Sequence, residues 1–148
     1  MVDIRFAKYD DFEGIMALYE LLAPEDTLPA ADILRPLWDE IVHQSGTYRY
    51  GVAEAEGQLV STANIVIVPN LTHKGMPYAV IENVITHPVA RRKGFGRAVI
   101  QLLLEFAREK NCYKVMLLSG SHRKEAHVFY KSLGFNGDIK RGFTFDMK

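Results

Sequence analysis

The sequence has little cysteine, no long apolar run and no excess of either charge. Its single cysteine, Cys112, excludes a disulfide within the chain and suits a reducing compartment. No apolar run reaches the roughly 18 residues of a membrane-spanning helix, and the N-terminal segment MVDIRFAKYDDF has no signal-peptide character. The 18 basic and 18 acidic side chains cancel, which argues against nucleic-acid binding through overall charge. We therefore expect a cytoplasmic protein with neither a membrane nor a nucleic acid as partner.

Two familiar phosphate-binding motifs are also missing. The chain has no GxxxxGK[ST] loop, and the third glycine of a GxGxxG fingerprint is replaced by Val99 after Gly94 and Gly96. A nucleotide-binding module of the NAD type would also need an acidic partner for the ribose, which we do not find. His122 and His127 are spaced poorly for sharing a metal on one helix face, and we expect no metal site.

The pattern of apolar residues predicts one α/β domain, residues 1–148, with a mixed sheet. Strands are predicted at residues 2–9, at 78–88, at 112–118, at 141–148 and in a hairpin over 47–69 that turns at Glu56 and Gly57. Helices are predicted at residues 12–22, around 34–41, at 94–110 and at 123–135. The strands on either side of the 94–110 helix form a βαβ unit and should be parallel.

The stretch HPVARRKGFGRA, residues 87–98, joins an apolar strand to this helix. Backbone N–H groups at a helix N-terminus are unpaired and bind phosphate well. Gly94 and Gly96 remove side chains that would keep a ligand from the backbone. The nearby positive charges are Arg91, Arg92, Lys93 and Arg97. By itself the stretch fits a solvated basic turn as well as a phosphate site.

Two motifs in register distinguish these readings. Arg91-x-x-Gly94-x-Gly96 follows a strand ending VITHP, and AHVFYKSLGF follows the next strand. This pair resembles the GNAT superfamily of acyl-CoA-dependent N-acyltransferases, strongly over residues 78–135 and before that only in element order. The resemblance implies the GNAT fold, a mostly antiparallel sheet with one splayed parallel strand pair and about four flanking helices.

The resemblance also implies acetyl-CoA as the acyl donor. Its pyrophosphate would lie on the loop Arg91, Arg92, Lys93, Gly94, Phe95, Gly96 and Arg97. Its pantetheine arm would lie along Val84, Ile85 and Thr86, the strand that also offers an N–H toward the thioester carbonyl. Many family members have an asparagine three residues before the alanine that corresponds to Ala126. That position is Arg123 here, so Ser119 or Arg123 is expected to supply the cofactor contact.

Two catalytic residues follow from the same resemblance. Tyr130 matches the family tyrosine that protonates the departing thiolate, although it also lies on the apolar stripe of its helix. Glu82, the only acid in the central strand, is the candidate base for the acceptor amine; a surface glutamate is the alternative. Strand alternation predicts Glu82, Val84 and Thr86 on one face and Asn83 and Ile85 on the other. His73 and Tyr78 are weaker candidates.

The function predicted from these residues is N-acetylation of a primary amine by direct attack, with a small molecule as acceptor. The alternatives are acetylation of a protein or peptide amine and a non-catalytic acyl-CoA-binding domain. A route through Cys112 is disfavoured, because no base is recognisable near it. Glu25 and Asp26 are interpreted as part of a solvated acidic loop. A homodimer is expected only because the family that the chain resembles commonly forms dimers.

Overall fold

The computed structural model of the chain describes residues 1–22 and 28–147. The chain divides into two compact units, residues 1–116 and the rest from residue 117, and each is described by itself. Glu25 and Asp26, and with them the interpretation of an acidic loop, lie outside the described residues. The prediction of a single domain stays a prediction.

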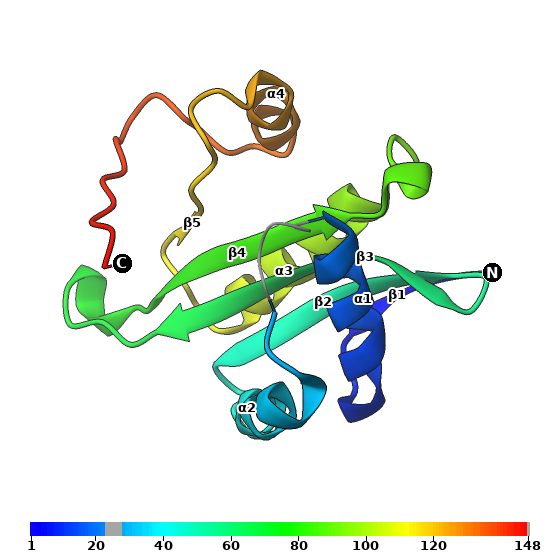
Figure 1. The fold of residues 1–148 in the computed structure, drawn as a ribbon. Helices are drawn as coiled ribbons and strands as arrows, with labels where there is room; N and C mark the ends of the chain where they lie inside the picture. The colour runs from blue at the N-terminus through cyan, green and yellow to red at the C-terminus, as the bar shows by residue number, and fades with distance from the viewer. Residues whose placement is uncertain (23–27, 148) are drawn as a thin grey trace. The chain divides into compact units, whose positions relative to one another are not determined.

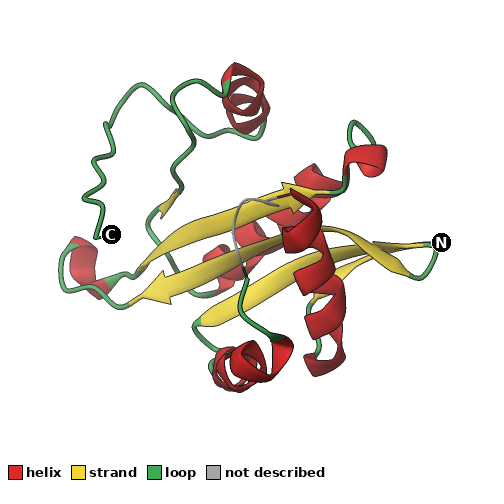
Figure 2. Cartoon of the chain, in the orientation of Figure 1, coloured by secondary structure: helices red, strands yellow, loops and turns green. Residues whose placement is uncertain are grey.

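The first unit is built on a mixed sheet (Figures 1 and 2). Its strands, five among the described residues, are β1 (Val2–Phe6), β2 (Tyr48–Ala55), β3 (Gln58–Val68), β4 (Tyr78–Thr86) and β5 (Val115–Met116). They lie in the order β1-β2-β3-β4-β5; only the β4–β5 pair is parallel. Glu56 and Gly57, with positive φ of 52° and 77°, make the hairpin turn between β2 and β3.

Helices cover both faces of this sheet (Figure 1). α1 (Phe12–Leu22) and α2 (Ala31–His43) pack on one, hereafter the α1 face, where Phe12, Ile15 and Trp38 form a core with Val52. α3 (Phe95–Glu109) packs on the other, the α3 face; a Cβ on Gly51 would lie 3.2 Å from the side chains of Val99 and Leu103 of α3. Residues adjacent in a strand point to opposite faces, so Gly51 belongs to the α3 face and Val52 to the α1 face.

The second unit contains α4 (Lys124–Ser132). Gly134 has a φ of 103°, and the Phe135 N–H donates to the Tyr130 carbonyl at 3.1 Å. This left-handed glycine is the expected end of the helix. None of the helices in the described part of the chain is long and apolar enough to cross a bilayer; the cytoplasmic location stays a prediction.

Three predicted elements differ from the structure. Residues 141–147 form no strand, although Phe143, Phe145 and Met147 alternate; these side chains are exposed, because alternation sets a face but a strand also needs a neighbour to pair with. The predicted buried strand at 112–118 is reduced to β5, and Leu118 beyond it is exposed. The second helix begins at Ala31, so Pro36 lies inside it and removes one backbone hydrogen bond without ending it. The fold class is confirmed: among the described residues, four α-helices accompany the mixed sheet.

Candidate active site

β4 contains a β-bulge at the point where site residues were predicted. Thr62 pairs with Ile85, and Asn64 pairs with Glu82. Two residues therefore separate Glu82 from Ile85, whereas one separates their partners on β3. Asn83 takes up this difference with a left-handed φ of 55°. A bulge of this kind leaves one residue unpaired and bends the strand.

The bulge overturns the predicted alternation of side chains along β4. Residues opposite one another on neighbouring strands share a face, and Thr62 pairs with Val52 of the α1 face. Glu82 and Ile85 therefore both lie on the α1 face, since their partners Asn64 and Thr62 are two residues apart. Thr86 pairs with Ser61 and lies on the α3 face. The prediction that Glu82 and Thr86 share a face, with Ile85 opposite, is wrong because an extra residue shifts the alternation.

The other edge of β4 is open over most of its length. β5 pairs with it only at Ala79 and Val80, and in the described parts of the chain no strand pairs with this edge from Ile81 to Thr86. The His87 N–H donates back to the Val60 carbonyl at 2.7 Å. Because backbone groups alternate in direction, the N–H of Thr86 points to the open edge. This edge can accept an extended ligand as an added strand.

The loop after β4 is held in place by short-range contacts. The Arg91 Nε donates to the Thr86 carbonyl at 3.4 Å, and the His87 Nδ1 accepts from the Val89 N–H at 3.2 Å. Arg92 and Gly94 have positive φ of 64° and 85°. From the sequence, Gly94 was predicted to leave space for a ligand close to the backbone. The structure adds that its left-handed φ itself favours glycine, with nothing within 4 Å of a Cβ placed there.

The N-terminus of α3 presents unpaired donors. Its first intrahelical bond runs from the Ala98 N–H to the Gly94 carbonyl at 3.0 Å. The N–H groups of Phe95 and Gly96, which precede it, have no intrahelical acceptor and carry the positive end of the helix dipole. The start of this 15-residue helix therefore favours a negatively charged group.

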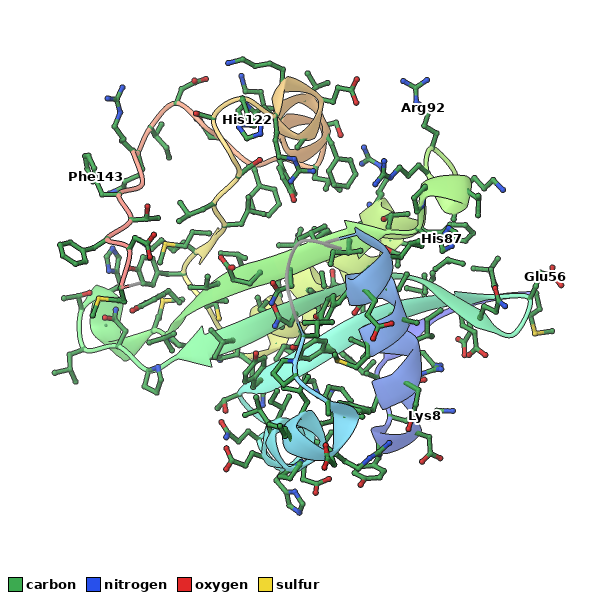
Figure 3. All side chains as sticks on the ribbon, in the orientation of Figure 1. Lys8, Glu56, His87, Arg92, His122 and Phe143 are labelled. Carbon is green, nitrogen blue, oxygen red and sulfur yellow. The ribbon has the colours of Figure 1, made fainter. Side chains whose placement is uncertain are left out.

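Full positive charges lie beside these donors. Arg91, Arg92 and Lys93 are exposed, and none of the ion pairs among residues 1–22 and 28–147 involves them. Figure 3 shows Arg92 pointing away from the sheet at the end of β4, with His87 on the preceding turn. Arg97 is half-buried on the first turn of α3. The loop thus combines backbone donors with three exposed cations, Arg91, Arg92 and Lys93, that have no ion pair within the described residues.

The remaining predicted residues belong to the second unit. Tyr130 on α4 is 9% exposed and packs edge-on against Phe135, with ring centroids 5.9 Å apart. The Ser119 hydroxyl oxygen is buried and has no hydrogen-bond partner in the described part of the chain. Arg123 is exposed and immediately precedes α4. A buried hydroxyl without a partner is costly, which makes Ser119 a fitting place for a polar ligand atom.

The two weaker candidates lie at the beginning of β4, away from the loop. His73 stacks on Tyr113 with ring centroids 3.7 Å apart, and Tyr78 meets the same ring edge-on at 6.5 Å. Both rings therefore have packing partners. Burial raises the pKa of the Cys112 thiol, which favours the protonated thiol over the nucleophilic thiolate; a route through Cys112 was also disfavoured from the sequence.

A group of polar side chains beside Glu82 was missed from the sequence. The Asn64 Nδ2 donates to the Tyr48 hydroxyl at 3.1 Å, and Tyr50 stacks on Tyr48 with centroids 5.9 Å apart. Burial, with the neighbouring Tyr50 and then Tyr48 hydroxyls, raises the pKa of Tyr19 on α1. Two sequence features could have indicated this group. Tyr48 and Tyr50 are two residues apart on β2, and Asn64 lies in the mainly apolar second half of β3. Among the described residues, no group of three or more histidine, cysteine, aspartate or glutamate side chains could hold a metal ion.

Comparison with protein families shows the family to which this chain belongs. Residues 15–135 match the model of the acetyltransferase (GNAT) family. The chain belongs to this family. The family resemblance predicted from the two sequence motifs is thereby confirmed, and with it the enzyme class at the level of the family.

Named GNAT relatives match over different lengths. A glucosamine 6-phosphate N-acetyltransferase of Trypanosoma brucei brucei is 39% identical over 79 residues, 53% of this chain and 52% of that protein. A glucosamine 6-phosphate N-acetyltransferase of rice is 27% identical over 92% of this chain and 82% of that protein. The chain thus spans about half of the first relative and most of the second.

Solved structures agree with the GNAT fold over nearly the whole chain. A protein of Agrobacterium tumefaciens strain C58 is 39% identical, with a TM-score of 0.91 over 98% of this chain and 99% of that one. An acetyltransferase of Trypanosoma brucei is 26% identical, with a TM-score of 0.84 over 99% and 100% of the two chains. The glucosamine-6-phosphate N-acetyltransferase of Arabidopsis thaliana, at 24% identity and a TM-score of 0.82, shares the fold.

Proposed function

We propose that this GNAT protein transfers the acetyl group of acetyl-CoA to a primary amine of a small molecule by direct attack. The observation that carries the proposal is the loop from Arg91 to Gly96. It joins unpaired helix N–H groups, a left-handed glycine, and the cations Arg91, Arg92 and Lys93, which have no acidic partner among residues 1–22 and 28–147. Its chemistry fits a pyrophosphate better than a solvated turn, because all these features favour an anion at one place.

The residues for the cofactor arm are those of the open edge of β4. In this proposal, Val84 to Thr86 bind the pantetheine amides through their backbone, and the N–H groups of Phe95 and Gly96 bind the pyrophosphate. Ser119 or Arg123 supplies a further contact. When bound, acetyl-CoA provides the activated thioester; the chain binds and orients it.

The acceptor amine has to lose a proton, because alkyl amines are mostly protonated at neutral pH. Glu82, exposed on the α1 face of β4, is the proposed base, acting directly or through water. Tyr130 is the proposed donor to the departing thiolate. These roles follow from the family motif and from side-chain chemistry.

A small-molecule acceptor is favoured by the relatives that carry a substrate in their names. Both the trypanosomal and the rice relative are named for glucosamine 6-phosphate. A protein amine as acceptor, or acyl-CoA binding without turnover, would appear as different outcomes of the experiment below. Dimerisation stays a prediction from the family resemblance.

The test has two stages. In the first, acetyl-CoA or CoA should raise the melting temperature of the protein, whereas NAD and ATP should not; no effect of CoA would sink the proposal. In the second, release of free thiol is followed with a panel of amino sugars, polyamines, aminoglycosides, amino acids and a peptide. Thiol release with the peptide alone would reassign the acceptor, and stabilisation without release from any amine would identify a binding domain.

A further inference from the structure

Four polar side chains, one of them Glu82, form a continuous group on the α1 face. Tyr50, Asn64 and Glu82 lie opposite one another on β2, β3 and β4. Residues opposed in this way have Cβ atoms about 5 Å apart. Tyr48, two residues before Tyr50, reaches Asn64 through the 3.1 Å hydrogen bond. The Tyr48 hydroxyl is thereby brought over the strand that adjoins Glu82.

The direction of this hydrogen bond determines what Tyr48 can offer. The Asn64 Nδ2 donates, so the Tyr48 oxygen accepts, and the phenolic proton is left for another acceptor. The neighbouring Tyr50 hydroxyl can accept it, and a ligand oxygen on this face can accept it in its place. Burial, followed by the Tyr50 hydroxyl and, more weakly, the charge of Glu82, raises the pKa of Tyr48. The phenol therefore stays protonated and remains a donor at any physiological pH.

A second hydroxyl approaches from α1. The Tyr19 oxygen is buried and has no hydrogen-bond partner among residues 1–22 and 28–147. A buried hydroxyl left unsatisfied costs roughly 1–3 kcal/mol, so a water or a ligand oxygen is expected to bond to it. Donors from two elements thus lie on the face that carries an exposed carboxylate.

We propose that Tyr48 and Glu82 form a two-point site for a vicinal amino alcohol, an acceptor whose amine has a hydroxyl on the neighbouring carbon. Glu82 binds the amine and takes its proton, while the Tyr48 O–H donates to the hydroxyl oxygen. Asn64 is a positioning residue that orients Tyr48, and Tyr19 is placed to bind a further oxygen. The inference rests on the proposed acetyltransferase activity and names the acceptor class that this site selects.

The test compares two amines that differ by one hydroxyl, trans-2-aminocyclohexanol and cyclohexylamine, with rates expressed per neutral amine. The wild-type protein should show a kcat/KM about tenfold higher for the amino alcohol, the size of one well-formed hydrogen bond. Tyr48→Phe should bring this ratio close to one. Asn64→Asp, which gives the Tyr48 proton an acceptor inside the protein, should lower the ratio in the same way. Tyr113→Phe, a tyrosine outside the group, is the control and should keep the wild-type ratio.

A ratio near one in the wild type, or an unchanged ratio in Tyr48→Phe, overturns the inference. A separate binding measurement tests the amino-alcohol site independently of the acetyltransferase activity. With CoA present, trans-2-aminocyclohexanol should raise the melting temperature of the wild type more than cyclohexylamine does, and Tyr48→Phe should lose that difference. If no amine is acetylated but the difference in melting temperature is observed, the result supports the amino-alcohol site and contradicts the acetyltransferase activity. If the difference is absent, the site falls.

Discussion

The Ser61 hydroxyl lies 2.9 Å from the Thr86 hydroxyl and donates to the Ile85 carbonyl at 3.0 Å. Ser61 is fully buried, so these bonds are sheltered from solvent. They fix the end of β4 against β3 beyond the bulge at Asn83. The backbone proposed to bind the cofactor arm is therefore held on its β3 side and open on the other, which is the arrangement that an added strand needs.

The glycine at the beginning of α3 can be tested by Gly94→Ala. The left-handed φ of 85° disfavours a Cβ, although nothing lies within 4 Å of it, so we expect a loss of about 1 kcal/mol in stability and a larger loss of CoA binding. Gly57→Ala is the matched control: its φ is +77°, and it also has open space around it. Thermal unfolding with and without CoA measures both effects. Equal CoA binding by the two variants would count against the phosphate site.

The loop cations can be tested by Arg92→Ala. Loss of one exposed charge near the pyrophosphate should weaken CoA binding by about fivefold at low salt, since a pair at contact in water is worth about 1 kcal/mol. Lys74→Ala is the control, because Lys74 is an exposed cation with a φ of 62°, close to the 64° of Arg92. Titration at two salt concentrations should show the difference shrinking as salt is added. A salt-independent difference would point to a change in the loop backbone.

Removal of the proposed base, Glu82→Gln, should lower kcat/KM by about 100-fold near neutral pH. The loss should become smaller as the pH rises, because more of the amine is then already neutral. Glu109→Gln changes an exposed acid of α3 and serves as the control. The pH profile of thiol release decides: a constant loss at every pH would assign Glu82 to binding the acceptor.

Tyr130→Phe keeps the ring that packs against Phe129 and Phe135 and removes only the hydroxyl. We expect thiol release to slow by about 100-fold, because an acid in the proton transfer contributes at least that much. Stabilisation by CoA should stay close to that of the wild type. Thiol release at the wild-type rate would remove the role of general acid.

The Asp11 carboxylate provides a pH-dependent contribution to stability. Burial raises its pKa, but the hydrogen bonds from Arg5 and from the Lys8 N–H together outweigh this and lower it. A carboxylate whose pKa is lowered by folding stabilises the folded state at pH values above the ordinary aspartate pKa near 4. This contribution to stability is lost as the pH falls through the pKa that the group has in the folded protein. Asp11→Asn should therefore cost about 2 kcal/mol at pH 7 and progressively less below about pH 4. Denaturant unfolding at both pH values, with the exposed neighbour Asp10→Asn as control, measures this.

The sequence predicted the elements whose signals are local. The helix after Gly94 was predicted because apolar periodicity, the glycines and the cations lie within one short stretch, and the helix observed at Phe95–Glu109 follows it closely. The hairpin turn at Glu56 and Gly57 was found for the same reason. The prediction of a strand over residues 141–148 was wrong, because the alternation of Phe143, Phe145 and Met147 does not show whether a partner strand is present.

The missed parts of the candidate site depend on register. The bulge at Asn83 arises from the pairing of β4 with β3, which no property of β4 alone reveals. Tyr48 and Asn64 meet only because β2 and β3 pair with Tyr50 opposite Asn64. Tyr19 reaches the same face from a helix, so three elements have to be placed before the group can be recognised.

The extra residue in β4 reverses the faces to which the following side chains of the strand point. Ahead of Asn83 the strand presents Glu82 to the layer of α1 and α2, and three positions later it presents Ile85 to that same layer, where an uninterrupted strand would present a residue of the opposite layer. A deletion of one residue here would leave the composition of the strand almost untouched and yet exchange its two sides from that point on. The arrangement of the proposed site therefore depends on the length of a short segment as much as on the identity of its side chains.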